Sequence, residues 1–274
     1  MKKILCVALA LVLIFSLSAC GANSAKSSNS PDTKNSPNSP SANQSANNNT
    51  NNSNSSNAPS SNATITNTPS EAYGKYTDMK GIAYNNISGK MSENVELVFS
   101  AVLTILPVAM VDLTLIPLTI IGVEGGEAAL TFLGMGNINI EQSGDVHTIT
   151  YTSSDGASMT QTCEYDAATD SLKSIISDIG ESLDSLVFEY TRCGDGYVSQ
   201  YAMYEEERGD YTLIKMYFNA DGDVTIGIEN ISGKPDSIFK KTGFSSDFAH
   251  NKSSYFALEG GTLTVFSDGK TKTY

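Results

Sequence analysis

The sequence contains no tryptophan, only two histidines (His147 and His250) and only four cysteines among 274 residues. So few cysteines exclude a disulfide-dense miniprotein, and none of them are paired at the spacing of a zinc site. Histidine is the most frequent general base in enzymes, so its scarcity argues against a hydrolase. We therefore predict a non-enzymatic protein with no catalytic residues, no metal site and no cofactor.

Cationic side chains are also scarce, with 17 Lys and Arg against 30 Asp and Glu. Four of these cations and one of these acids precede residue 71, so the rest of the chain carries 13 − 29 = −16 charges. Nucleic-acid binding depends on Lys and Arg side chains that displace counterions from phosphates. The charge balance therefore predicts no nucleic-acid partner.

Residues 21–70 lack aromatic residues, Leu, Val and Met, and they contain 14 Asn, 14 Ser and 5 of the 8 Pro. Such a composition cannot bury enough apolar surface to offset the entropy lost on ordering. We predict three parts: a signal peptide over residues 1–19, an anchored and disordered tether over 20–70, and one globular domain over 71–274.

The leader combines two lysines, an apolar run over residues 4–17 and the sequence Leu17-Ser18-Ala19-Cys20. The run is shorter than the ~20 residues that a membrane-spanning helix requires, which is typical of a signal peptide. Leu17-Ser18-Ala19-Cys20 resembles the lipobox of bacterial lipoproteins, which are cleaved before the cysteine. The resemblance implies that Cys20 carries a diacylglycerol with acyl chains such as palmitate. We therefore expect the protein to be anchored at the outer face of the cell membrane, in a Gram-positive cell.

Residues 71–134 are apolar and predict an N-terminal helical pair. Ser92, followed by Glu93 and Glu96, has the pattern of an N-cap with acids in the first helical turn. Apolar residues then recur at helical spacing until Pro107, which is expected to disturb the helix because it removes a backbone donor.

The role of the apolar segment 97–123 is left open by its pattern. We expect the helices to be buried against a sheet, and a pair that lines an apolar cavity is the second interpretation. A membrane segment is the third, although Asp112 and two prolines within the segment would be costly in hydrocarbon.

From residue 137 onward, short runs rich in Thr, Tyr, Val and Ile alternate with turn dipeptides such as Asp-Gly. This pattern predicts an antiparallel meander, and thus an α+β fold whose sheet can curve into a half-barrel. The predicted strands cover 137–142, 146–153, 158–165, 185–193, 197–205, 211–219, 223–229, 254–258 and 262–267, with 170–178 either a strand or a short helix.

Two tight turns in the centre of the meander would align Tyr190 with Tyr201 and Met216 on the core face. Glu189 would then face solvent on the other side. The following turn places Val224 on the wrong face, so we expect either a bulge or a sheet that is covered on both faces.

Cys163 and Cys193 are the cysteines of the domain. A tight turn at Asp155-Gly156 would place Cys163 and His147 on opposite faces, so no thiol nucleophile is predicted. The exported location permits a disulfide between Cys163 and Cys193, and two buried thiols are the alternative.

In outline, the expected domain resembles the LolA-like half-barrel lipoprotein carriers, in which a curved sheet and helices enclose acyl chains. The resemblance covers architecture and the apolar segment 95–133, so it assigns no binding residues. It implies binding of an apolar or amphipathic ligand, or an accessory role with an envelope protein. The alternatives are a module that recognises protein or wall polymer and, less favoured, a wall hydrolase.

Overall fold

The computed structural model describes residues 68–274 apart from 181–182 and 252, and it leaves out the side chains of 95 and 98–105. The predictions for the signal peptide, for Cys20 and for residues 20–67 of the tether therefore lie outside the described residues, whereas Pro69 and Ser70, the end of the predicted tether, already belong to a helix. The described part belongs to one compact unit, Thr64–Tyr274.

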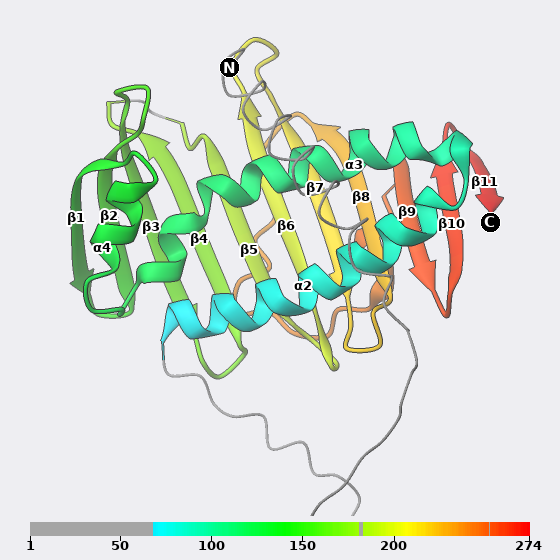
Figure 1. The fold of residues 1–274 in the computed structure, drawn as a ribbon, viewed down its shortest axis with the longest axis horizontal. Helices are drawn as coiled ribbons and strands as arrows, with labels where there is room; N and C mark the ends of the chain where they lie inside the picture. Colours follow the sequence, from blue (N-terminus) through cyan, green and yellow to red (C-terminus); the bar gives the residue numbers. More distant parts are fainter. Residues whose placement is uncertain (1–67, 181–182, 252) are drawn as a thin grey trace, which may run out of the picture. The chain divides into compact units, whose positions relative to one another are not determined.

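The unit contains one open sheet in which each strand pairs antiparallel with the next along the chain (Figure 1). The predicted meander is thus confirmed, and the segment after Asp170 is a strand. A short last strand, absent from the prediction, forms the far edge. The strands are β1 (Gly136–Ser143), β2 (Val146–Thr152), β3 (Ser158–Asp166), β4 (Ser171–Asp178), β5 (Leu186–Cys193), β6 (Gly196–Glu205), β7 (Asp210–Phe218), β8 (Val224–Ile231), β9 (Ser254–Glu259), β10 (Thr262–Ser267) and β11 (Lys270–Thr273).

The helices precede the sheet: α2 (Pro69–Ser92), α3 (Val95–Thr114), the 3-10 turn η2 (Ile116–Ile120) and the short α4 (Gly126–Phe132). The predicted cap at Ser92 is wrong, because Ser92 ends α2. Asn94 caps α3 instead, and its side chain accepts a hydrogen bond from Glu96 N at 3.0 Å. Pro107 lies inside α3 rather than at its end.

The helical pair predicted from the sequence is therefore formed by α2 and α3, and not by two halves of the segment after residue 92. Among the described residues, no helix meets the length and apolarity needed to cross a membrane.

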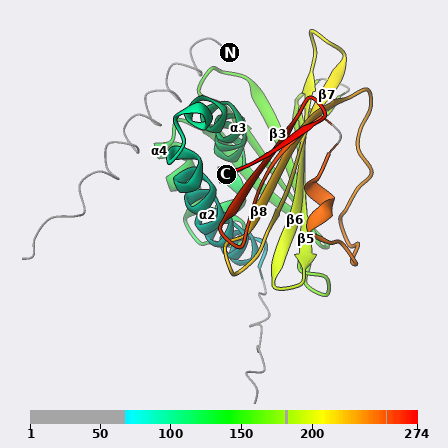
Figure 2. The same ribbon diagram turned by 90° about the vertical axis from the view of Figure 1, so that its right-hand side faces the viewer.

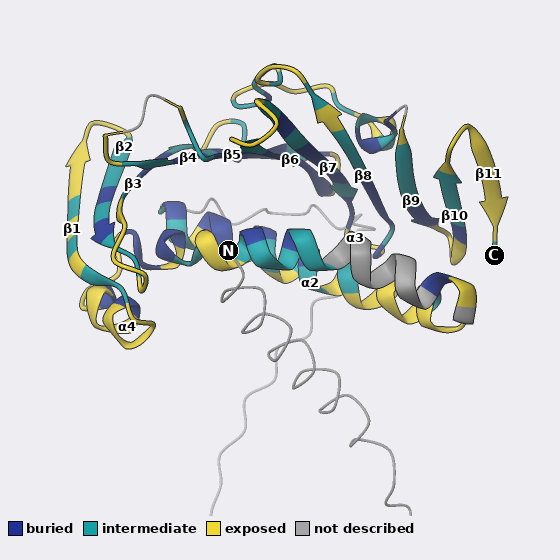
Figure 3. Cartoon of the chain, turned by 90° about the horizontal axis from the view of Figure 1, so that it is seen from above, coloured by how far each residue is buried: buried dark blue, intermediate teal, exposed yellow. Residues whose placement is uncertain are grey.

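The helices cover one face of the sheet, which curves around them (Figures 2 and 3). A stripe along α2 faces this concave side, and its members recur every three or four residues. Its apolar side chains are almost fully buried and join one core with the concave side chains of the strands. The stripe consists of Tyr73, Tyr76, Lys80, Ala83, Ile87 and Met91.

The core face was predicted correctly in the centre of the sheet, although the pairing is shifted by two residues. Tyr201 pairs with Phe188 and Ile214, so it shares the concave face with Tyr190. A five-residue connection after β7 brings Val224 opposite Phe218 on this same face. The mismatch expected at that turn therefore does not occur.

The other face of the central strands is covered as well, by the connection between β8 and β9 (Figure 2). We call this connection, residues 232–253, the strap; it contains the 3-10 turn η3 (Ser246–Ala249). Glu189, predicted to face solvent, is only 1% exposed beneath it. Its carboxylate accepts hydrogen bonds from Ser237 Oγ, Ile238 N and Gln200 Nε2 at 2.7–2.9 Å.

Candidate functional site

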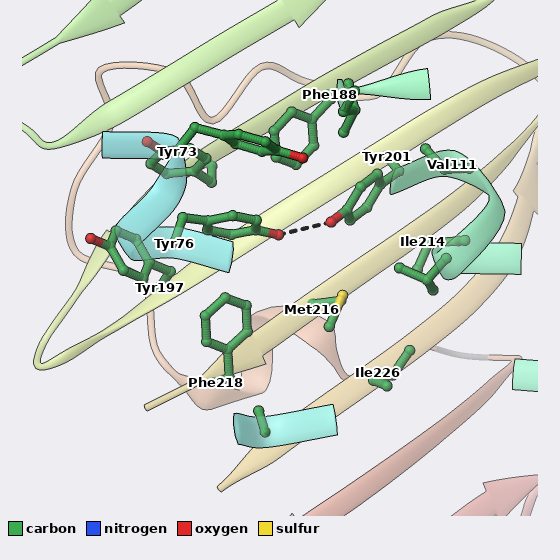
Figure 4. Close-up of a cluster of buried hydrophobic side chains, with 14 of the residues drawn as sticks. Tyr73, Tyr76, Val111, Phe188, Tyr197, Tyr201, Ile214, Met216, Phe218 and Ile226 are labelled. Carbon is green, nitrogen blue, oxygen red and sulfur yellow. Dashed lines mark hydrogen bonds between the residues drawn. The ribbon is translucent and has the colours of Figure 1, made fainter. Parts of the chain in front are cut away.

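The concave face under α2 is a cluster of aromatic rings centred on Tyr76 (Figure 4). The Tyr76 ring stacks on Tyr190 with a centroid distance of 4.5 Å and meets Phe188 edge-on at 5.6 Å. Tyr197 and Phe218 complete its surroundings at 5.7 and 5.3 Å. Tyr190, Tyr197 and Tyr201 therefore serve as core residues on this face.

Polar groups cross this aromatic cluster. The Tyr76 hydroxyl lies 2.9 Å from Ser199 Oγ, to which it donates, and 2.8 Å from the Tyr201 hydroxyl. Lys80 Nζ donates to Asp112 Oδ1 at 2.5 Å and to the Tyr201 hydroxyl at 3.3 Å. One hydrogen-bonded network thus joins α2, α3 and β6.

Lys80 and Asp112 form an ion pair whose side chains are 5% and 25% exposed. Burial lowers the pKa of the Lys80 ammonium, and the Asp112 carboxylate opposes that shift. A buried ion pair is often no more stable than apolar side chains of similar size, because both charges lose their hydration. The pair therefore links α2 to α3 above the sheet, and it stabilises this arrangement no more than apolar side chains of similar size would.

Two buried polar atoms on the concave face have no hydrogen-bond partner among the described residues: Gln161 Oε1 and the Tyr190 hydroxyl. Gln161 Nε2 is held by Ser174 Oγ at 3.0 Å. An unsatisfied buried polar atom costs about 1–3 kcal/mol, so these two atoms offset part of the stability that packing on this face provides.

Sequence reasoning found one half of the ion pair, since Asp112 is the only charge between Glu96 and Glu124. Lys80 was missed. The signal that could have found it is its position, because it lies at helical spacing between Tyr76 and Ala83 on the apolar stripe of α2.

The register between β2 and β3 shows that the predicted placement of Cys163 and His147 on opposite faces is wrong. His147 pairs directly with Cys163, one residue away from the predicted alignment, so the two share a face. The conclusion that Cys163 is no nucleophile does not change. Burial, with a smaller contribution from Glu164, raises the pKa of the Cys163 thiol to about 12, so the reactive thiolate is not formed near neutral pH.

The disulfide that the sequence left open is not formed. Cys163 and Cys193 are free thiols, with Cys163 in the concave core and Cys193 packed beneath the strap on the other face. The alternative of two buried thiols describes the structure. Within residues 68–274, apart from the gaps given above, no three potential ligand side chains gather as a metal site would require.

The concave face thus places an ammonium, a carboxylate and several hydroxyls among aromatic and aliphatic side chains. Comparison of the chain with models of protein families, with curated proteins and with solved structures found no match. The assignment of a function thus depends on the residues themselves.

Alkaline unfolding is the first testable consequence of this face. Burial, followed in most cases by the charge of Asp112, raises the pKa of the buried tyrosines Tyr73, Tyr76, Tyr190 and Tyr201 and of the half-buried Tyr84 above 10. The unfolded chain then releases more protons than the folded chain above pH 10, so the free energy of unfolding must fall there. The lowered pKa of Lys80 changes the free energy of unfolding with pH in the opposite direction, but it is a single group against several tyrosines.

We expect tyrosinate absorbance to rise in two steps, the exposed tyrosines near pH 10 and the buried ones together with cooperative unfolding at higher pH. Parallel circular dichroism identifies the second step. Complete titration of all 13 tyrosines near pH 10 in a folded protein would contradict the burial described here.

Proposed function

We propose that the chain is a lipid-anchored, extracytoplasmic binding protein, and that its concave face takes up an amphipathic ligand with an apolar chain. In this proposal α2 and α3 are a displaceable cover, and no covalent chemistry is involved. The leader with Cys20 and the Asn-rich tether support the extracytoplasmic, membrane-anchored location. The fold supports the binding role, because an open curved sheet presents one continuous apolar face.

The observation that carries the proposal is the polar network within that apolar face. A face that only had to hold two helices would be more stable with apolar side chains in place of Lys80 and Asp112. Instead, an ion pair, the Tyr201 hydroxyl and the unsatisfied Tyr190 hydroxyl lie on this face. They provide partners for the polar group of an amphipathic molecule once the helices separate.

A second function has support of its own. The side chains of α2 that face the sheet, including Tyr76, Ile87 and Met91, are fully buried in the concave core. This close packing favours the alternative in which the domain recognises an envelope protein or wall polymer through its outer surfaces. The two proposals differ in whether lipid reaches the concave face.

The anchor is tested by labelling cells with radioactive palmitate and isolating the full chain. We expect the label in the wild type and in Cys6→Ala, and its loss in Cys20→Ala, because only Cys20 lies at the lipobox. Mass spectrometry of the mature amino-terminal peptide should locate the diacylglycerol on Cys20. Equal labelling of Cys20→Ala, or a mature chain that begins elsewhere, would refute the anchor.

The ligand site is tested with a phospholipid that carries a photoreactive diazirine in its acyl chain, added to cells that express the full chain. Cross-links are expected on peptides of β5–β7 that carry the concave residues Phe188, Tyr201 and Met216. The double variant Lys80→Met/Asp112→Leu should label about fivefold less, because a closed state more stable by about 1 kcal/mol opens less often.

Lys80→Met alone should change the labelling in the opposite direction. It leaves the Asp112 carboxylate without its cation, which destabilises the closed state and should raise the labelling. The matched control is Lys272→Met on β11, which removes an exposed lysine whose carboxylate partner is 3.9 Å away. Cross-links confined to the strap side, or none at all, would reject the concave site and favour the interaction module.

A further inference from the structure

The strap lies on the face of the sheet opposite the helices, and it is fastened at several points along its length (Figure 2). Its outgoing arm is held by Glu189, and Gln200 Nε2 donates to Asp236 O at 3.0 Å. Its returning arm is held by Thr191 Oγ1, which donates to Lys241 O at 2.9 Å. The strap is therefore a fixed wall.

A pocket of about 440 Å³, open to solvent, lies between the strap and strands β6–β8. This volume lies within the range of small-molecule sites. Gln200, which is 2% exposed, lies in its lining, and aliphatic and aromatic side chains form much of the rest: Leu213, Ile231, Ile238, Phe244 and Phe248.

The pocket also carries two charges of each sign: Lys215 and Lys241 against Glu229 and Asp236. Lys215 Nζ and Glu229 Oε1 are 3.9 Å apart, which is beyond hydrogen-bond distance, so neither group saturates the other. The Lys215 ammonium also lies 5.2 Å from the centre of the Phe248 ring. Both groups thus keep free hydrogen-bonding capacity, and Lys215 does so beside an aromatic ring.

The remaining two charges are less engaged still. Neither Lys241 Nζ nor the Asp236 carboxylate has an ion-pair partner within the described part of the chain. A ligand with a single charge would satisfy one sign and leave the other facing it. A ligand that carries both an ammonium and a carboxylate can pair its ammonium with the acids of the pocket and its carboxylate with the lysines.

We propose that the strap pocket binds a short peptide or amino acid through its free termini. The ligand carboxylate accepts from Lys215 and Lys241, its ammonium donates to Glu229 and Asp236, and an apolar side chain packs against Phe244 and Phe248. This site is on the other face from the concave one and does not depend on the function proposed for that face.

The test is calorimetric titration of the full chain in detergent with the dipeptide alanyl-phenylalanine. Saturable binding is expected for the peptide with free termini. The same peptide with an acetylated amino end and an amidated carboxyl end should bind at least tenfold more weakly, because each lost charge-assisted hydrogen bond is worth about that factor.

Lys215→Met, Glu229→Gln and the exposed substitution Lys241→Gln should each weaken the free dipeptide about tenfold. Lys272→Met on β11 should leave the affinity unchanged. Circular dichroism shows which variants are folded, and Lys241→Gln keeps the test valid if the others are not.

Three results would overturn the assignment. One is no saturable binding at millimolar dipeptide, and another is equal affinity for the free and the blocked peptide. The third is binding of an uncharged chito-oligosaccharide that is lost in Phe248→Ala, which would assign the pocket to a glycan.

Discussion

The contact between Lys80 and Asp112 is the constraint on which the helical layer depends. It is the point where α2, α3 and the sheet meet, because the same ammonium also reaches the Tyr201 hydroxyl. Around it, the packing of aromatic and aliphatic side chains is joined by the hydrogen bonds of the Tyr76 hydroxyl to Ser199 and Tyr201. The ion pair therefore defines one position of the helices without making that position much more stable than others.

The two faces of the sheet are covered in different ways. The helices cover the concave face with large apolar side chains, whereas the strap covers the other face with a fastened loop that leaves a charged pocket open. The buried carboxylate of Glu189 makes the second arrangement possible, since it satisfies three donors from the strap and β6 at once. A sheet covered in this way can carry two independent binding sites.

Much of the fold could be predicted. Short runs in which apolar residues recur at every second position, separated by turns that contain Gly, indicate an antiparallel meander. The faces of Tyr190, Tyr201 and Met216 were correct even though the pairing slipped by two residues, since a shift by two keeps each side chain on its face. The prediction that His147 and Cys163 lie on opposite faces was wrong, because the pairing at that turn is shifted by one residue and places them opposite each other. The burial of Glu189 could not be predicted, because it depends on a strap that is distant in sequence.

The central claim is that α2 and α3 can leave the concave face while the sheet remains folded. Hydrogen exchange of the full chain, followed by mass spectrometry in lipid vesicles, measures this directly. We expect amides of α2 and α3 to exchange with an opening free energy below that of β5–β7, and to exchange faster as lipid is added. Exchange of α2 only with global unfolding, at a rate independent of lipid, would contradict the account.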